Sequence, residues 1–238
     1  MNLSQTEENY LKSLFKISQM YGNEEVGTNE LALSLSVKPA TANVMLKKLK
    51  EKELVEYEKY GKITLTESGK QCAKDIVRKH RLWETFLYEK LAFDWDEVHE
   101  VAEQLEHIHS PKLIERLDKF LNFPSFDPHG DPIPNNKGEL KIQFKKLLAD
   151  VPVGKSYKMA AVKDNSTLFL QYVVKVGLGI NNEITVISKQ AYDDLLVIEV
   201  NGLKSSVSHK FAENIYVVCL DCSNHERCPS ADCDLKNK

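Results

Sequence analysis

The hydrophobic pattern of the chain changes near residue 150, and this change constrains the fold more than any other feature. Before it, apolar residues recur three and four positions apart, as on the buried side of an α-helix. After it come β-branched runs such as "ITVIS", "LLVIEV" and "NIYVV", which are typical of strands. We therefore expect an α+β multidomain protein, with a helical N-terminal part and a C-terminal β-barrel of about SH3 size.

The first 70 residues predict a winged helix-turn-helix. "TEENYLKSLFKISQM" and "TNELALSLS" have helical patterns, with Thr28 expected as the N-cap of the second helix. Pro39 is expected in the first turn of a third helix, where its missing N–H costs nothing. "VEYEKYGKITLTESGK" then predicts two short strands around Gly61 and a break at Ser68–Gly69.

The rest of the chain divides by composition. Three further helices are expected in "KQCAKDIVRKHRLWETFLYEKL", "DWDEVHEVAEQLEHIHS" and "PKLIERLDKFLNF". A segment rich in Pro, Gly and Asn follows, and Asn201–Gly202 is a hairpin signal in the β-domain. The expected parts are a winged helix-turn-helix (1–70), a helical domain (71–125), a loop and linker (126–152), an SH3-like domain (153–218) and a Cys-rich tail (219–238).

Composition limits the possible environments. The 238 residues carry a formal charge of −3 and are 42% hydrophobic, which suits a folded protein. "MNLSQTEENY" has no features of a signal peptide, and no apolar run approaches the roughly 20 residues of a membrane span. Four of the five Cys lie in the last twenty residues, unlike a disulfide framework. A cytoplasmic protein without a membrane partner is expected.

The winged helix-turn-helix carries a local excess of positive charge. Between residues 38 and 62 there are seven Lys and four Glu, a balance of +3. Small or polar residues at the start of the third helix can reach base edges, and Lys can contact phosphates. A solvated Lys face would give the same charge, but the order of elements favours double-stranded DNA. The candidate DNA-binding residues are Thr28, Pro39, Ala40, Thr41, Asn43, Lys47, Lys48, Lys59 and Lys62.

The segment "HEVAEQLEHIH" (99–109) concentrates metal-binding side chains. On a helix, His99, Glu103, Glu106 and His107 are i, i+4, i+7 and i+8, and they share one stripe. His80 and Glu84 form a second i, i+4 pair on the preceding helix, as in metal sites of helix bundles. A solvated acidic face is the alternative, but five of the seven His lie between residues 80 and 129. "HEVAE" lacks the second His of the zinc peptidase signature.

These motifs together resemble one family. "RKHRLWETFL", "VHEVAEQLEH" and "DPHGDPIP", placed after a winged helix and before a small β-domain, resemble the diphtheria toxin repressor and manganese transport regulator family. The resemblance implies a homodimeric transcriptional regulator, not an enzyme, that binds palindromic operator DNA when loaded with Mn²⁺ or Fe²⁺. It further implies repression of metal-uptake genes, and a winged helix-turn-helix, a helical metal-binding and dimerisation domain and an SH3-like domain.

The resemblance also implies ligands, by position. The main site would use Glu103, Glu106, His107 and Asn9, and the ancillary site His80, Glu84, His99, Asp127, His129 and Asp164. Glu103 stands where the iron-sensing branch has Cys, and a hard oxygen donor favours Mn²⁺. Asn9 replaces the acid of the manganese branch, and Asp127 replaces a Cys. Lys12 stands where a further acidic ligand can occur, which argues against a coupled two-Mn²⁺ cluster.

Two other functions and one other site remain open. A winged-helix regulator could sense a small organic ligand, or the His and Glu residues could serve a metal-dependent hydrolase. The tail has a C-x2-C pair and further donors, which suggests a structural Zn²⁺ site or simply a reduced, flexible tail. Its candidate zinc ligands are Cys219, Cys222, His225, Cys228 and Cys233.

Overall fold

The computed structural model describes residues 3–22, 24–57, 61–141 and 143–220. The chain forms two compact units. The first comprises residues 1–83, 101–123 and 133–140, and the second comprises residues 84–100, 124–132 and 141–238. In the described part of the chain, no helix has the length and apolar character that a membrane span requires.

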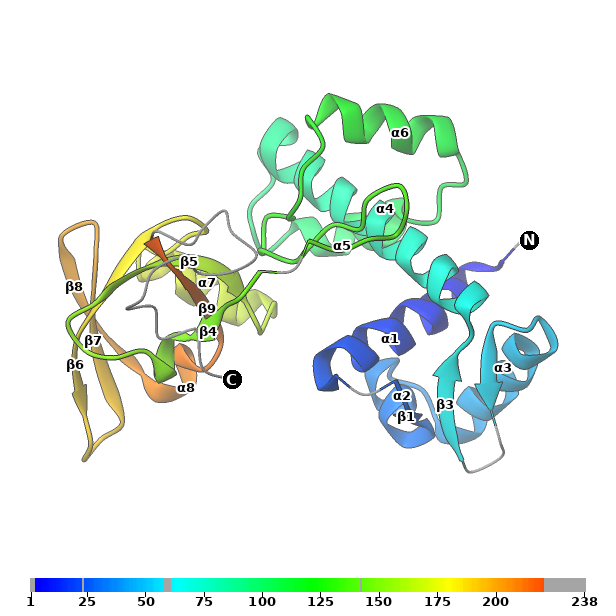
Figure 1. Ribbon diagram of the computed structural model, residues 1–238, viewed down its shortest axis with the longest axis horizontal. Helices are drawn as coiled ribbons and strands as arrows, with labels where there is room; N and C mark the ends of the chain where they lie inside the picture. Colours follow the sequence, from blue (N-terminus) through cyan, green and yellow to red (C-terminus); the bar gives the residue numbers. More distant parts are fainter. Residues whose placement is uncertain (1–2, 23, 58–60, 142, 221–238) are drawn as a thin grey trace. The chain divides into compact units, whose positions relative to one another are not determined.

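The N-terminal part of the first unit is a winged helix-turn-helix, as the sequence predicts (Figure 1). Its three strands form an antiparallel sheet in the order β1-β3-β2. Leu11, Leu14, Leu31, Leu46 and Leu49 fill one core shared by the three helices. The elements are α1 (Gln5–Tyr21), β1 (Val26–Gly27), α2 (Thr28–Ser34), α3 (Pro39–Glu51), β2 (Val55–Tyr57) and β3 (Lys62–Leu65).

Local signals account for the ends of these helices. Ser4 and Glu7 form a reciprocal capping box at the start of α1. Pro39 occupies the first turn of α3, which confirms the prediction. The prediction for Thr28 is wrong, because Gly27 is the N-cap of α2 and Thr28 is already helical. Gly27 pairs with Lys62 in the β1–β3 ladder, so that the helix starts directly after the strand.

Three helices follow, with bounds that differ from the expected ones. They are α4 (Glu67–Leu91), α5 (Val98–Leu105) and α6 (Pro111–Phe120). The predicted break at Ser68–Gly69 is wrong, because both residues belong to α4. The helix α5 begins later than expected, because the chain turns at Asp94–Glu97 and buries Trp95 in the core of the second unit. It also ends before Glu106 and His107, which lie in the turn that closes it.

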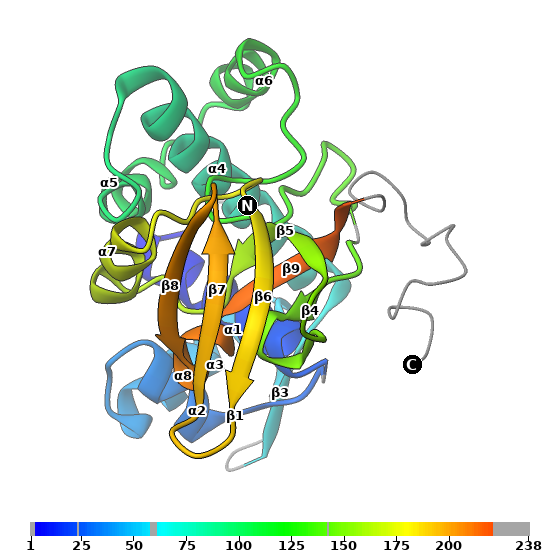
Figure 2. The same cartoon turned by 90° about the vertical axis from the view of Figure 1, so that its left-hand side faces the viewer.

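The second unit contains a six-stranded antiparallel sheet in the order β4-β9-β5-β6-β7-β8 (Figure 2). Asn201 and Gly202 both have positive φ and join β7 to β8, which confirms the predicted hairpin. The strand β5, near the middle of the sheet, was not predicted. The elements are β4 (Lys146–Leu147), the 3-10 helix η1 (Leu148–Asp150), β5 (Ser156–Val162), α7 (Thr167–Lys175), β6 (Glu183–Gln190), β7 (Leu195–Val200), β8 (Leu203–Ser208), α8 (His209–Ala212) and β9 (Ile215–Cys219).

The segment 124–132 lies against β5 within the second unit. Val162 N donates to the carbonyl of His129 at 3.0 Å. Gly130 has φ +84°, and a Cβ built on it would lie 1.9 Å from the carbonyl oxygen of Ala160. Only glycine combines this backbone conformation with so close an approach. The contact fixes the position of the turn that contains Asp127 and His129, two residues of a site described below.

Gly69 offers a test of the close packing at the start of α4. A Cβ at this position would lie 1.9 Å from the carbonyl oxygen of Leu54. Ala is the better helix former by about 1 kcal/mol, but overpacking typically costs about 1–3 kcal/mol. We expect Gly69→Ala to lower the free energy of unfolding by about 2 kcal/mol in urea titrations, since a backbone atom cannot move aside as a side-chain tip can.

The matched control is Gly179→Ala, outside the helices. A Cβ on Gly179 would meet nothing closer than the Asn182 side chain at 3.5 Å, and its φ is not in the left-handed region. Equal stability of Gly69→Ala and the control would contradict the close contact between α4 and Leu54.

Candidate metal sites

Two groups of His and acidic side chains stand out, each within one unit. The Glu106 cluster lies in the first unit and consists of Glu8, Lys12, His80, Glu103, Glu106 and His107. The Glu84 cluster lies in the second unit and consists of Glu84, His99, Asp127 and His129. Both clusters contain buried carboxylates, which are costly without a nearby cation or hydrogen-bond donors.

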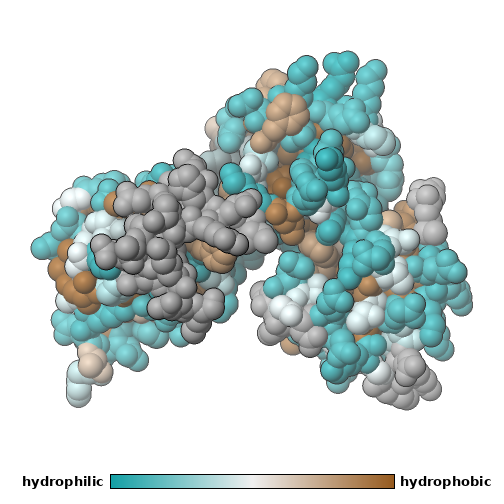
Figure 3. Space-filling view, viewed as in Figure 1, coloured by the Kyte–Doolittle hydropathy of each residue, from teal (hydrophilic) through white to brown (hydrophobic). Residues whose placement is uncertain are grey.

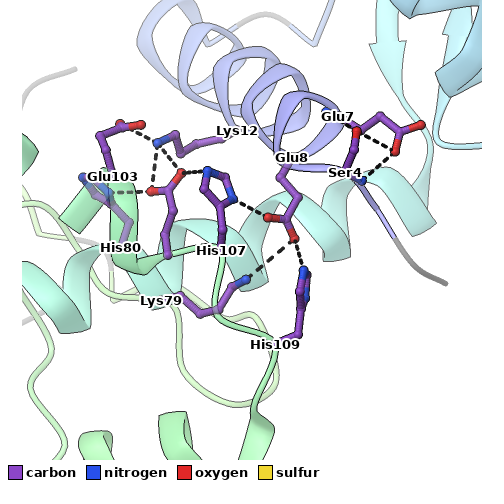
Figure 4. A network of polar contacts seen from close by, with 10 residues as sticks. Ser4, Glu7, Glu8, Lys12, Lys79, His80, Glu103, His107 and His109 are labelled. Atoms are coloured by element: carbon purple, nitrogen blue, oxygen red, sulfur yellow. Dashed lines mark hydrogen bonds and ion pairs between the residues drawn. The ribbon is translucent and has the colours of Figure 1, made fainter. Parts of the chain in front are cut away.

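Three helices and the turn that follows α5 supply the Glu106 cluster (Figure 4). Glu8 and Lys12 are four residues apart on α1 and share one side of that helix. His80 comes from α4, and Glu103 from α5. Glu106 keeps a helical hydrogen bond to Ala102, and both Glu106 and His107 lie in the turn that closes α5. The cluster therefore brings together residues almost one hundred positions apart in the sequence.

Glu106 is the centre of its cluster and is fully buried. Its Oε2 lies 2.6 Å from His80 Nδ1, and its Oε1 lies 2.6 Å from Lys12 Nζ. Burial favours the neutral acid, but the hydrogen bond and charge of His80 and the ammonium of Lys12 outweigh it and lower the pKa of Glu106. The group is therefore held as a carboxylate, the form that binds metal ions.

Glu8 orients His107, and the sequence analysis missed this role. Glu8 is buried, and its Oε2 lies 2.5 Å from His107 Nδ1. The other ring nitrogen of His107, Nε2, lies 3.8 Å from Glu106 Oε1. A carboxylate on one nitrogen of a histidine fixes the ring and makes the other nitrogen a better metal ligand. The signal available in the sequence was the position of Glu8 one turn before Lys12.

The donor set of the Glu106 cluster fits a divalent ion that prefers oxygen and nitrogen. Glu103, Glu106 and His107 offer two carboxylates and one imidazole, without a thiolate. Asn9 lies beside Glu8 on α1, and its Oδ1 is shielded from solvent with no hydrogen-bonding partner among the described residues. An unpartnered buried acceptor of this kind is costly unless a cation or donor satisfies it.

The Glu84 cluster has three buried members. Ligand atoms of Glu84, Asp127 and His129 all lie within 4.8 Å of one another. His99 adds its Nδ1 at 3.0 Å from Glu84 Oε1. The Oδ1 of Asp127 accepts hydrogen bonds from the backbone N–H groups of His129 and Asp131, both at 2.9 Å. The turn thus holds Asp127 in place, and two buried carboxylates at this distance favour a shared cation.

Trp95 clamps the turn that carries this cluster. Its ring stacks on that of His129, with centroids 5.5 Å apart, and its Nε1 donates to the carbonyl of Pro128 at 2.9 Å. His129 Nε2 lies 3.0 Å from the carbonyl oxygen of Trp95, so this nitrogen carries the proton. The Nδ1 of His129 then faces Glu84 as an acceptor, at 3.9 Å from its Oε1.

Two further expected ancillary ligands, His80 and Asp164, have polar contacts of their own. His80 contacts Glu106 and so belongs to the Glu106 cluster. Asp164 precedes α7, and its Oδ1 accepts a hydrogen bond from Ser166 N at 2.8 Å. Of the possible zinc ligands, Cys219 ends β9, and Cys222, His225, Cys228 and Cys233 lie outside the described residues.

The candidate DNA-binding residues have unequal exposure. Pro39, Ala40, Thr41, Lys47 and Lys48 are exposed on α3. Asn43 is half-buried and accepts a hydrogen bond from the Tyr57 hydroxyl, which ties α3 to β2. Lys62 pairs with Glu25, the hydroxyl of Thr28 is buried, and Lys59 lies outside the described residues.

Three family models match successive parts of the chain. Residues 2–63 match "Iron dependent repressor, N-terminal DNA binding domain", and residues 66–135 match "Iron dependent repressor, metal binding and dimerisation domain". Residues 146–219 match "FeoA domain".

Individual proteins of known sequence or structure are also similar. An uncharacterized HTH-type transcriptional regulator of Methanocaldococcus jannaschii is 40% identical over 119 residues, which cover 50% of this chain and 94% of that protein. The iron-dependent repressor IdeR of Mycobacterium tuberculosis is 32% identical over 136 residues, 56% of each chain. A solved structure of a manganese-dependent transcriptional repressor in complex with manganese has a TM-score of 0.80 at 34% identity, and covers 90% of this chain and 100% of that one.

Trp95 provides a test of the Glu84 cluster. Trp95→Phe removes the hydrogen bond to Pro128 and loosens the turn that presents His129. Loss of a residue that holds a metal ligand in place typically lowers metal affinity by about 10–100-fold. We therefore expect the Mn²⁺ affinity of Trp95→Phe, measured by isothermal titration calorimetry, to fall at least about tenfold. The chain has two Trp residues, so Trp95 is the only fluorescent Trp in a Trp83→Phe variant. Its fluorescence should therefore change as Mn²⁺ is added to that variant. An unchanged Mn²⁺ affinity in Trp95→Phe would contradict the role of Trp95 in positioning His129.

Proposed function

The chain belongs to the iron-dependent repressor family of metal-dependent transcriptional regulators, and we propose that it is a homodimeric repressor that binds palindromic operator DNA in the cytoplasm when Mn²⁺ or Fe²⁺ is bound. Genes for metal uptake are the proposed targets, because a repressor that is active only with bound metal would stop uptake once enough metal is present. The observation that carries the proposal is the Glu106 cluster, where α1 of the winged helix-turn-helix meets the acids of α5 and its closing turn.

The proposed main ligands are Glu103, Glu106, His107 and Asn9. Their oxygen and nitrogen atoms suit Mn²⁺ and Fe²⁺, and the carboxylate of Glu103 favours Mn²⁺. Glu8 acts behind His107 rather than on the ion, because its carboxylate holds Nδ1 and leaves Nε2 for binding.

The proposed second site is the Glu84 cluster. Glu84, Asp127 and His129 supply three buried donors, with His99 hydrogen bonded to Glu84. Asp164 stays a proposed contributor, which would have to give up its bond to Ser166 N. Because Asp127 and His129 lie on the segment that contacts β5, occupancy of this site would stabilise the packing of that segment on the FeoA-type domain.

The regulatory step follows from the shared core of the first unit. A bound divalent ion would add a second link to the one that Lys12 makes, because it would join Asn9 of α1 to the ligands of α5 and its closing turn. Leu11 and Leu14 of α1 pack in the same core as Leu46 and Leu49 of α3, so fixing α1 fixes α3. The exposed N-terminal end of α3, with Ala40 and Thr41, would enter the major groove. Metal shifts the population toward this form only by binding it more tightly.

The helix α6 supports the proposed homodimer. Leu113 and Phe120 of α6, and Phe123 just after its end, are 38%, 63% and 63% exposed. In the space-filling view, apolar patches interrupt the hydrophilic surface (Figure 3). Exposed aromatic side chains are typical of protein interfaces, and two copies of this segment would cover each other's apolar side chains.

One observation favours a different effector. The second unit has a cavity of about 660 Å³ between α4, β5 and the segment after α7, with Trp95, Met159 and Ile180 among its lining residues. This volume suits a small organic ligand. DNA binding that ignores metal ions and responds to such a compound would favour that function.

Gel-shift titration of the protein on its own upstream DNA tests the proposal, with Mn²⁺, Fe²⁺, Zn²⁺ or a chelator in parallel. We expect Glu103→Ala plus His107→Ala to abolish metal-induced binding, because two ligands are lost, and to leave a folded dimer. The matched control is His209→Ala plus Glu213→Ala, which removes an exposed His–Glu pair of α8 and its C-cap. Metal-induced binding that survives the first double variant would show that the ion lies elsewhere.

Glu103 also offers a test of metal preference. We expect Glu103→Cys to raise the relative response to Fe²⁺ or Co²⁺ and to weaken the response to Mn²⁺, because a thiolate replaces a hard oxygen donor. Fluorescence anisotropy with labelled operator DNA gives the threshold for each metal, with Glu103→Asp as the oxygen-donor control. Thresholds in the same order for the Cys variant and the control would contradict the role of Glu103.

A further inference from the structure

Lys12 is a buried cation at the centre of the Glu106 cluster. It is 5% exposed, and its Nζ lies 2.5 Å from Glu103 Oε1 and 2.6 and 2.9 Å from the two oxygens of Glu106. An ammonium has three N–H donors and no acceptor, so these three contacts use its full capacity. Figure 4 shows the Lys12 side chain reaching from α1 to Glu103, one of the two acids.

The contacts of the Lys12 ammonium resemble the coordination of a bound metal ion more than they resemble a surface ion pair. Two carboxylates from α5 and its closing turn converge on one atom, and that atom comes from a different helix. Lys is almost never fully buried unless it is paired, and removal of one partner of a buried pair is strongly destabilising. Lys12 therefore joins α1 to α5 with charge that the chain itself supplies.

We propose that the Lys12 ammonium is a resident cation that takes the place of a second divalent ion, so that the Glu106 cluster binds one metal ion per protomer and α1 is held to α5 before metal arrives. This inference rests on the proposed function, because it concerns the same ligands. The ammonium and a divalent ion repel each other, so two divalent ions and Lys12 cannot share these two acids.

Donors remain for the one ion. Glu103 contacts Lys12 through Oε1, and a carboxylate has about four lone-pair sites, so this contact does not use its full capacity. His107 Nε2 is 3.8 Å from Glu106 Oε1 rather than within hydrogen-bond distance, and Asn9 Oδ1 is buried without a partner among the described residues. Each carboxylate oxygen has two lone pairs, so Glu106 can serve Lys12 and a metal ion together.

Two measurable properties follow. Replacement of the ammonium by a carboxylate would free the position of the second divalent ion. The Lys12→Glu variant should therefore bind one more divalent ion than the parent. Replacement by a neutral side chain of similar length would leave the buried Glu106 and the half-buried Glu103 without their cation. The metal-free form of Lys12→Met should therefore unfold at a lower temperature, and Mn²⁺ should raise its melting temperature by more than in the parent.

The experiment measures Mn²⁺ stoichiometry by native mass spectrometry and melting temperatures by calorimetry. The full chain is used with Asp127→Ala and His129→Ala, so that the Glu84 cluster does not contribute. We expect one ion per protomer for this parent, two for Lys12→Glu, and one for the control Lys16→Glu, which makes the same charge change one turn along α1. Where Lys12→Glu does not fold, the melting temperatures of Lys12→Met decide.

The outcomes separate the two ideas. Two bound Mn²⁺ ions per protomer of the parent would overturn the proposal that Lys12 is a resident cation. One bound ion per protomer in both the parent and Lys12→Glu would overturn it as well. Equal Mn²⁺-induced rises in melting temperature for the parent and Lys12→Met would also overturn it. A parent that binds no Mn²⁺, while Glu103→Ala plus His107→Ala leaves the full chain's metal response unchanged, would instead overturn the proposed function.

Discussion

The buried carboxylate of Glu106 is the interaction on which the first unit depends. It has no exposed surface, and Lys12 of α1 and His80 of α4 each approach it to 2.6 Å. A carboxylate in such a place is stable only while its partners stay together. The position of α1, and through the common leucine core the position of α3, therefore depends on what neutralises this one group.

Histidine orientation is the common feature of the two clusters. His107 is held by the carboxylate of Glu8, and His129 by the carbonyl of Trp95. In each ring one nitrogen is engaged and the other faces a buried acid, Glu106 or Glu84. Because a fixed ring loses no further rotational freedom on binding, such support raises affinity without an additional ligand. The partners differ in kind, so the two sites can differ in affinity while their ligands are similar.

The sequence also shows how one residue can change the character of a metal site. Lys12 replaces a possible acidic ligand, and it brings a positive charge into the same space. From the sequence this substitution only argues against a two-metal cluster. The structure adds that the ammonium contacts Glu103 and Glu106 at once, which makes it a structural tie as well as a substitution.

Short-range signals made much of the fold predictable from the sequence, and long-range contacts decided the remainder. Pro39 at the start of α3 and Asn201–Gly202 between β7 and β8 act through their own backbone preferences, so they could be predicted correctly. Gly69 predicts a break in the sequence, but it lies within α4, where the missing Cβ lets the carbonyl of Leu54 approach the helix. The ligand types of both sites were visible in the sequence. The pairing of Glu8 with His107 was not, because it joins atoms 99 residues apart and only the packing of α1 in the folded unit brings them together.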